Sequence, residues 1–221
     1  MNAVKRTLTV LTAAAVTATA SAGTQTWDFS GGLDGWMTYG EWETRDGILH
    51  SSWGQYAFVG EEHWDNYTVE VKARIDKPPS FSESEWAGLI FRAQVDSWKH
   101  FDCYAFCVNL LFDEVRLNRI SRRGGSTSTG SYSAPLRAGA RMKLGEWFTL
   151  RAHVKGTRIL LSVNNILHAE IWNSRIASGR IGLYSAAFIS FDDLTVTGDS
   201  IEDRLQLNGK LAAQWAQLKQ D

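Results

Sequence analysis

The sequence predicts an all-β fold of antiparallel sheets, in a sandwich or a barrel, on three observations. Between Gly23 and Gly198, short runs alternate apolar and polar residues with the period of a β-strand, and no helical period intervenes. Turn residues such as the pair Asp46-Gly47 separate these runs. The chain contains ten Trp, ten Phe, six Tyr and 19 Gly but only three Pro, a composition frequent in β-rich folds and in carbohydrate binders.

Composition also excludes several classes of protein. The 221 residues are 44% hydrophobic and 21% charged, close to globular averages, which excludes a disordered, collagen-like or coiled-coil chain. The chain contains 23 Lys and Arg residues and 24 Asp and Glu residues, so its formal net charge is -1. No global field therefore draws the chain to nucleic acid or to an anionic membrane, and we expect no nucleic-acid partner.

Residues 1–22 have the order of a secretory signal peptide. Lys5 and Arg6 precede an uncharged run over residues 7–18, and small residues follow up to Ala22. The run is shorter than the roughly 20 apolar residues that span a bilayer. We therefore expect cleavage after Ala22 and a secreted or periplasmic protein without membrane insertion.

Residues 23–198 are expected to form one sandwich domain of about eleven strands. The expected strands cover residues 27–29, 47–50, 67–75, 87–94, 102–111, 114–120, 147–154, 158–163, 166–171, 180–184 and 190–196. Two interruptions are expected to be exposed loops. Residues 77–85 contain adjacent prolines that cannot continue a strand, and residues 121–133 are rich in Gly, Ser and Thr.

The only two cysteines, Cys103 and Cys107, lie within one expected strand. Four residues along a strand cover roughly 13 Å, whereas bridged cysteines have Cα atoms within about 7 Å. We therefore predict two free and mostly buried thiols.

The tail over residues 199–221 changes to a helical period. One face of this period is formed by residues three or four apart, at Ile201, Leu205, Asn208, Leu211, Trp215 and Leu218, which predicts an amphipathic helix weakened by Gly209. We expect this helix to pack on its own domain; the alternative is a helix that binds a protein partner or mediates self-association.

Six motifs follow one another along the chain in a fixed order. They are WETRDGIL at residues 42–49, HWDNYTVEV at 63–71, AGLIFRAQ at 87–94, GEWFTLRAHVKG at 145–156, GRIGLY at 179–184 and FDDLTV at 191–196. This order resembles the concanavalin A-like lectin/glucanase superfamily, most closely its laminin-G-like and 3-keto-disaccharide hydrolase-type domains and the carbohydrate-binding modules built in the same way. The resemblance covers about residues 24–198.

The resemblance implies a jelly-roll sandwich of two antiparallel sheets, one of them curved, with sugars bound on the concave face or at its rim. Three function classes follow from it: a carbohydrate-binding domain, a glycoside hydrolase or lyase of the 3-keto-disaccharide type, and a laminin-G-like protein-interaction module. We favour a carbohydrate-binding domain that recognises a glycan on its concave face. One departure from the family is the hairpin pair Asn164-Asn165 in place of the usual Asp-Gly, which tolerates the same positive φ.

The residues do not supply the carboxylate pair of a glycosidase. Glycosidases of this superfamily carry the pattern Glu-x-Asp-x-x-Glu on one strand, and the sequence contains no such strand. Glu83 and Glu85 share one face, but they lie in the proline-containing loop and are interpreted as solvated acids. The five histidines lack metal-ligand spacing. Catalytic residues therefore stay unassigned, and enzymatic activity stays open.

Strand alternation predicts a ligand site on the concave face. If Leu89 and Phe91 enter the core, Arg92 and Gln94 face the open side. Trp98 follows in a polar turn, where its ring can stack on a sugar, whereas Trp42, Trp64 and Trp147 lie in the fold-bearing motifs and are expected in the core. The expected ligand-binding residues are Arg92, Gln94, Trp98, Tyr104, Arg116 and Asn118, of which Tyr104 matches a family aromatic.

A competing interpretation of this set is structural. Arg92 and Arg116 would then be held in ion pairs with Glu70, Asp102 or Glu114 and would only stiffen the sheet.

The resemblance also implies a structural calcium ion on the convex side. The matching positions are Gly47, through its carbonyl, and Asp192 in FDDLTV, and oxygen ligands of this kind suit calcium. The alternative is that Asp192 caps a turn or faces solvent. No other cofactor is expected.

Overall fold

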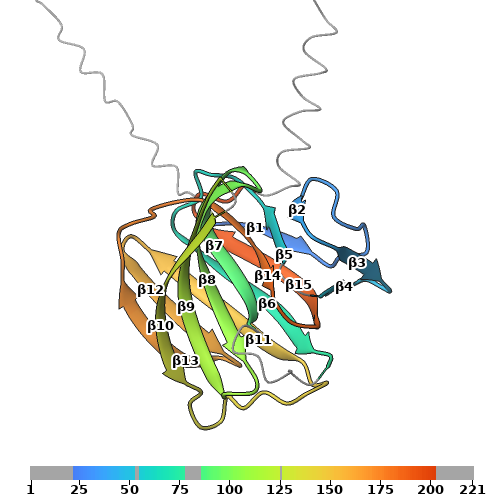
Figure 1. Cartoon of the computed structure of the whole chain (residues 1–221). Helices are drawn as coiled ribbons and strands as arrows, with labels where there is room; N and C mark the ends of the chain where they lie inside the picture. The colour runs from blue at the N-terminus through green and yellow to red at the C-terminus, as the bar shows by residue number, and fades with distance from the viewer. Residues whose placement is uncertain (1–21, 53–54, 78–85, 125, 203–221) are drawn as a thin grey trace, which may run out of the picture.

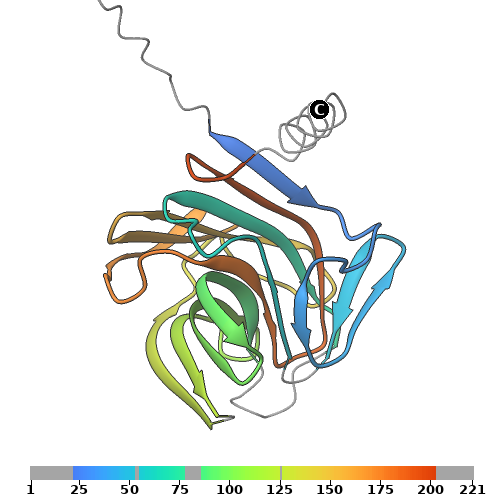
Figure 2. The same cartoon turned by 90° about the horizontal axis from the view of Figure 1, so that it is seen from above.

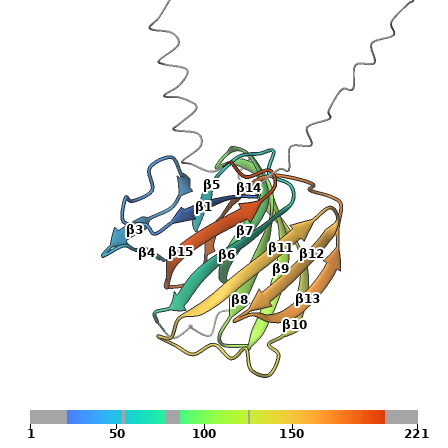
Figure 3. The same ribbon diagram turned by 180° about the vertical axis from the view of Figure 1, so that it is seen from behind.

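The computed structural model describes residues 22–52, 55–77, 86–124 and 126–202, and these residues form a sandwich of two antiparallel sheets (Figure 1). Sheet A has eight strands, in the order β13-β12-β11-β6-β15-β4-β3, with β1 paired to β15. Sheet B has seven strands, in the order β10-β9-β8-β7-β14-β5-β2. Figure 3 shows sheet A from behind, with β12, β11, β6 and β15 side by side.

The strand bounds are as follows. Sheet A contains β1 (Gly23–Trp27), β3 (Trp42–Arg45), β4 (Ile48–Ser51), β6 (Tyr67–Ile75), β11 (Phe148–Lys155), β12 (Arg158–Val163), β13 (Ile166–Trp172) and β15 (Ile189–Gly198). Sheet B contains β2 (Met37–Tyr39), β5 (Gln55–Val59), β7 (Ala87–Ser97), β8 (His100–Asn109), β9 (Glu114–Arg123), β10 (Ser126–Pro135) and β14 (Arg180–Ser185).

The core lies between the two sheets, because each turns one apolar face toward the other. On β6 the alternate residues Val69, Val71 and Ala73 are fully buried, and they face Leu89 and Phe106 of sheet B within one cluster. Each large side chain buried in this way stabilises the fold by about 1.5–3 kcal/mol. The period-2 pattern that predicted β6 is therefore the pattern of its contact with sheet B.

The first and last strands of the sandwich pair along their length. Gly23 lies opposite Gly198, and Trp27 lies opposite Leu194. The two ends of the segment that resembles the superfamily therefore lie side by side.

Sequence analysis missed β5 because all five of its side chains are buried. Tyr56 and Phe58 pack on one face of sheet B, while Val59 faces the core. A strand covered on both faces shows no alternation of apolar and polar residues. The short strands β2 and β3, of three and four residues, were not predicted either.

The Gly/Ser/Thr-rich segment, predicted to be an exposed loop, is instead the edge strand β10. It pairs with β9 from Ser126 opposite Arg123 to Pro135 opposite Glu114. Gly124 closes the hairpin with a φ of +59°. Strand propensity depends on the neighbouring strand, so pairing with β9 overrides the weak intrinsic preference of this segment. The Asn164-Asn165 turn has positive φ at both residues, as predicted.

Both cysteine thiols are free and buried, as predicted. Cys103 and Cys107 share one face of β8. Burial raises the pKa of Cys107 to about 12 and that of Cys103 well above its ordinary value. These thiols are therefore protonated and shielded at neutral pH, which excludes them as nucleophiles.

Two predicted elements fall wholly or largely beyond the described part of the chain. Residues 1–21 of the expected signal peptide and residues 203–221 of the expected C-terminal helix lie outside the described residues. Among the residues that the structure describes, no helix is long and apolar enough to cross a membrane.

Candidate functional site

The face of sheet B that looks away from sheet A is concave. β5 and β8 are separated by β14 and β7, so on a flat sheet their backbones would lie about 14 Å apart. The rings of Tyr56 on β5 and Phe101 on β8 nevertheless have centroids only 4.9 Å apart. The sheet must therefore curl toward this side, and Figure 2 shows the two layers from above.

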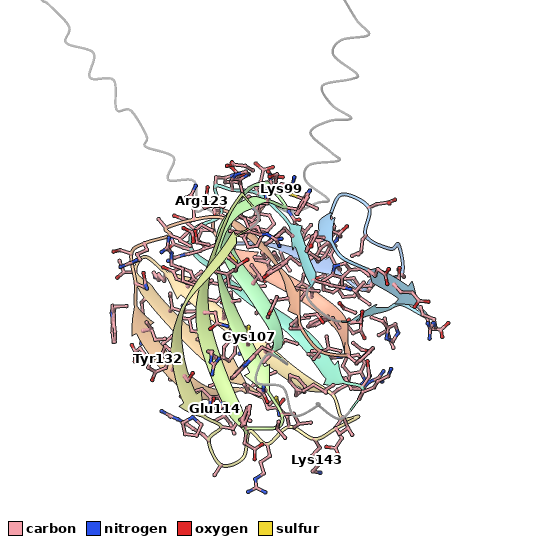
Figure 4. The ribbon with its side chains drawn as sticks, viewed as in Figure 1. Lys99, Cys107, Glu114, Arg123, Tyr132 and Lys143 are labelled. Carbon is pink, nitrogen blue, oxygen red and sulfur yellow. The ribbon has the colours of Figure 1, made fainter. Side chains whose placement is uncertain are left out.

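Aromatic and apolar side chains fill the centre of this concave face. They form a second hydrophobic cluster that contains Tyr56, Phe58, Ile90, Phe101, Cys103, Ala105, Cys107 and Ile120. Figure 4 shows Cys107 in the middle of the face. Burial raises the pKa of Tyr56 to about 12. A buried apolar centre offers a polar ligand little to bind, so recognition falls to the rim of the face.

One rim of the concave face carries two stacked aromatic rings. Trp98 lies on the turn between β7 and β8, and its ring is nearly parallel to that of Tyr39, at an angle of 3° with centroids 5.0 Å apart. Because Tyr39 lies on β2, at the edge of sheet B, the β7–β8 turn arches across the concave face. Trp98 nevertheless remains 42% exposed.

Two cations accompany these rings. The guanidinium carbon of Arg122 lies 4.9 Å from the Tyr39 ring centroid and 5.4 Å from that of Trp98, and Lys99 Nζ lies 4.8 Å from the Trp98 centroid. Cations at these distances are attracted to the ring faces. We call Tyr39, Trp98 and Arg122 the rim platform.

A hydrogen bond fixes the turn that carries Trp98. The backbone nitrogen of Gly124 donates to His100 Nε2 at 3.2 Å, which ties the β7–β8 turn to the β9–β10 turn. Lys99 on the first turn and Arg123 at the end of β9 lie at the same end of the molecule in Figure 4. The rim platform is therefore held from both turns.

Arg116 and Asn118 face the concave side, as predicted, but neighbouring groups hold both. The Arg116 guanidinium carbon lies 3.9 Å over the Trp86 ring, and its Nε donates to Ser133 Oγ at 2.8 Å. Glu114 lies 3.7 Å from the same guanidinium, as the competing interpretation proposed. Asn118 is buried, with its Nδ2 3.9 Å from Cys107 Sγ.

Arg92 does not face the concave side, which corrects the expectation from strand alternation. The pairing of β7 with β8 shifts between Phe91 and Gln94, and Arg92 has a φ of +50°. This β-bulge turns the Arg92 side chain away from the concave face. Leu89 and Phe91 do enter the core, as predicted.

The buried Arg92 side chain connects three loops. Its guanidinium donates to the carbonyl oxygens of Asp65 at 3.1 Å, Gly156 at 2.5 Å and Ile176 at 3.3 Å. These partners differ from the carboxylates of the competing interpretation: Glu70 pairs with Arg151, and Asp102 pairs with Arg119. Burial lowers the pKa of Arg92.

Gln94 and Tyr104 also lie away from the concave face. Gln94 Nε2 donates to the carbonyl oxygen of Ser178 at 2.8 Å. Tyr104 is in the core cluster, and its hydroxyl donates to Asn173 Oδ1 at 2.6 Å. The six expected residues therefore divide into Trp98, Arg116 and Asn118 on the concave side and Arg92, Gln94 and Tyr104 on the other. Their part in ligand binding stays a prediction.

The tryptophans of the fold-bearing motifs divide as well. Trp64 is buried, as predicted, and Trp42 packs partly against the core. Trp147 is 39% exposed instead, and the Arg74 guanidinium carbon lies 4.7 Å over its ring. The residue lies just before β11, where the chain has not yet entered the sheet.

Sequence reasoning missed a pocket on sheet A beside β3 and β4. It has a volume of about 520 Å³ and is lined by aromatic, acidic and basic side chains, among them Trp42, Glu41, Glu43, His50, Asp76 and Phe188. Sheet register assembles its polar centre, because Ser190 lies opposite both His50 and Arg74. No spacing along the sequence signals this group, since Ser190 is 140 residues from His50.

Hydrogen bonds in this group fix the tautomer of His50. Ser190 Oγ donates its single proton to Asp76 Oδ2 at 2.5 Å. His50 Nδ1, 2.8 Å from Ser190 Oγ, must therefore be the donor in that contact, which leaves the lone pair of the neutral ring on Nε2. Arg74 Nε donates to Asp76 Oδ1 at 2.7 Å and orients the carboxylate. Ser190 is fully buried, which excludes it as a nucleophile. Both Asp76 carboxylate oxygens already accept hydrogen bonds, so His50 Nε2 is the proton-accepting atom that this set leaves open to a ligand.

The expected calcium ligands lie near each other but form a sparse donor set. Gly47 precedes β4, and Asp192 follows Phe191, which pairs with Leu49 of that strand. Asp192 Oδ1 already accepts a hydrogen bond from the backbone of Asp193 at 2.8 Å. The described residues contain no group of three or more His, Cys, Asp or Glu side chains placed to hold a metal ion. Calcium takes about six to eight oxygens, so its binding here stays a prediction.

The chain matches a protein family over most of the sandwich. Residues 25–197 match the family described as the 3-keto-alpha-glucoside-1,2-lyase-like domain. The chain belongs to this family. A search of curated protein sequences finds no match.

Solved structures similar to this lyase-like domain share its fold at low sequence identity. The carbohydrate-binding module CBM66 from Bacillus subtilis is 19% identical, with a TM-score of 0.57 over 73% of this chain and 94% of that chain. The metal-free carbohydrate recognition domain of Emp46p is 14% identical, with a TM-score of 0.52 over 79% and 93%. A Bacteroides ovatus GH16 protein in complex with a glucan product is 8% identical, with a TM-score of 0.51 over 79% and 97%. These likenesses show that the chain shares its β-sandwich fold with these structures.

Proposed function

We propose that this domain binds a carbohydrate at the rim platform of its concave face. The parallel stack of Trp98 on Tyr39, with Arg122 over both rings, is the observation that carries the proposal. An exposed flat ring stacks on the C–H face of a sugar, and a guanidinium supplies planar donors for the hydroxyl groups beside it. The Lys99 side chain is exposed, so it can move away from the Trp98 ring when a sugar binds there.

Trp98→Ala tests this site, with Trp172→Ala as the matched control because Trp172 is 66% exposed on β13. A glycan array of the wild-type protein first identifies a binding sugar. Trp98→Ala should then weaken binding at least tenfold, which corresponds to about 1.4 kcal/mol, while Trp172→Ala leaves it unchanged. Equal affinity in the Trp98 variant would contradict the site. Absence of any glycan ligand, together with capture of a protein partner, would favour the laminin-G-like module instead.

A second candidate function is base-catalysed elimination on a 3-keto glycoside in the His50 pocket. Family membership and the free lone pair on His50 Nε2 favour it. A C3 carbonyl makes the hydrogen on C2 acidic, so a base can remove it. The electron pair then forms the C1–C2 double bond, the C1–O bond breaks, and the leaving oxygen takes up the proton. His50 would accept the C2 proton and return it to that oxygen.

NMR of a 3-keto-α-glucoside incubated with the protein tests this reaction. Loss of the C2 proton signal with release of the second sugar is the expected result, and His50→Gln should slow it at least a hundredfold. His63→Gln is the control, because His63 is exposed and lies outside this pocket. Turnover that is equally fast in the His50 variant would exclude His50 as the base.

We also propose that the protein acts outside the cytoplasm, on the pattern of residues 1–22. N-terminal sequencing of the protein recovered from the periplasm or the medium should begin at Gly23. Residues 1–22 still attached to that protein would reverse the proposal.

A further inference from the structure

A separate pocket opens at the free edge of the sandwich, between β10 of sheet B and β13 of sheet A. It has a volume of about 400 Å³, within the range of small-molecule sites, and is lined by Tyr104, Arg119 and Tyr132 from sheet B and by Ile171, Asn173 and Arg175 at the end of sheet A. Figure 4 shows Tyr132 at this edge of the molecule. The pocket shares no lining residue with the rim platform or with the His50 pocket.

A glycine keeps the pocket open. Gly130 on β10 lies opposite Arg119 on β9, and a Cβ at this position would meet no atom within 4 Å. Its φ lies outside the left-handed region, so a larger residue can occupy the position without backbone strain. A side chain at position 130 would therefore enter open space beside Arg119.

The polar groups of the pocket are mostly hydrogen-bond donors. The oxygen of the Asn173 amide accepts from the Tyr104 hydroxyl at 2.6 Å and from the Arg175 backbone at 3.0 Å, so its Nδ2 is the part left for a ligand. Arg119 is bound on one side by Asp102, while its buried Nε makes no hydrogen bond within the described structure. The pocket therefore presents an amide and two guanidinium groups.

The charge of the pocket is positive. Its charged lining residues are Arg119 and Arg175, and Asp102, which neutralises Arg119, lies outside the lining. In the part of the chain that the structure describes, no carboxylate lies within ion-pair distance of Arg175. One positive charge is thus available to a ligand.

We propose that this edge pocket binds a sugar that carries an anionic group, a carboxylate or a sulfate. The guanidinium of Arg175 matches the geometry of such an anion, and the Tyr132 ring, 50% exposed, can stack on the sugar that bears it. The proposal rests on the carbohydrate-binding function above and adds a second subsite, distinct from the rim platform, that selects for charge.

Chemical-shift titrations of the full mature protein with sodium glucuronate, glucose 6-sulfate and neutral glucose test the proposal. The wild type should bind at least one of the two anionic sugars at least tenfold more tightly than glucose. Arg175→Gln, which removes the unpaired charge, and Gly130→Leu, which fills the pocket, should each weaken that binding at least tenfold. Arg141→Gln, an exposed arginine that does not line the pocket, should leave it unchanged.

The outcomes separate this proposal from the one for the rim platform. Loss of anionic-sugar binding with retained binding of the glycan held at Trp98 supports a separate charged subsite. Anionic sugars that bind no better than glucose, or that bind equally to both pocket variants, overturn it whether or not the rim platform binds a glycan. Arg175→Gln replaces an exposed side chain, so the test stands even if Gly130→Leu does not fold.

Discussion

Replacing Arg92 with alanine should destabilise the sandwich without changing the ligand affinity of the folded protein. The substitution removes the guanidinium that joins the carbonyl groups of Asp65, Gly156 and Ile176. Since this side chain does not reach the concave face, the variant separates a scaffold role from a ligand-binding role.

The expected loss follows from the contacts. A hydrogen bond from a charged donor contributes about 1.5–3 kcal/mol, and two of the three Arg92 bonds, at 2.5 and 3.1 Å, are well formed. We expect Arg92→Ala to lower the free energy of unfolding by about 3–5 kcal/mol. Alanine also retains the unfavourable φ of +50°, whereas glycine does not, so Arg92→Gly should be more stable than Arg92→Ala by roughly 1 kcal/mol.

Urea unfolding of the wild type and both variants measures these differences. Arg116→Ala is the control, because Arg116 lies on the concave side and is partly exposed. This substitution should lower the free energy of unfolding by less than about 1 kcal/mol. A free energy of unfolding for Arg92→Ala that lies within about 1 kcal/mol of the wild-type value would refute the scaffold role. A glycine variant less stable than the alanine variant would refute the argument from backbone strain.

Three further predictions concern the thiols, the pH dependence of stability and the metal. Cys103 and Cys107 should not react with a thiol reagent in the native protein and should both react after denaturation. Burial lowers the pKa of His153 and of His168, so near their ordinary pKa the unfolded chain binds protons that the folded chain does not. The free energy of unfolding should therefore fall as the pH drops through about 6.5. Replacing both histidines with glutamine should make the free energy of unfolding depend less on pH in this range. Dialysis against a chelator should lower the melting temperature if the expected calcium is bound, and an unchanged melting temperature with no metal detected would remove the site.

Strands with one buried face could be predicted from the sequence, and strands that depend on their neighbours could not. β6 and β11 were found because their side chains alternate between the core and solvent. β5 has both faces covered and so lacks the alternation, while β10 is a strand because β9 pairs with it. The alternation of apolar and polar residues reflects which faces of one strand are buried, so it cannot identify the strand with which that strand pairs.

The same limit applies to the candidate site. Trp98 was identified because it lies in a polar turn between two predicted strands. Its partners Tyr39 and Arg122 come from β2 and β9, and only the curl of sheet B brings them together. Arg92 was misplaced because one bulge changes the face of every later residue on the strand, which period-2 reasoning assumes to be constant.

The β-bulge on β7, which was not predicted from the sequence, also helps to position the rim platform. β7 departs from regular pairing with β8 twice, between Phe91 and Gln94 and between Val95 and Ser97, just before the turn that carries Trp98. Bulges bend a strand and increase its twist, so both act to carry this turn over the concave face toward Tyr39. Arg92 holds the first bulge by bonding to loops that include the ends of sheet A. The two departures from regular pairing therefore position the exposed Trp98 ring, while Arg92 contributes to the stability of the fold beside the first of them.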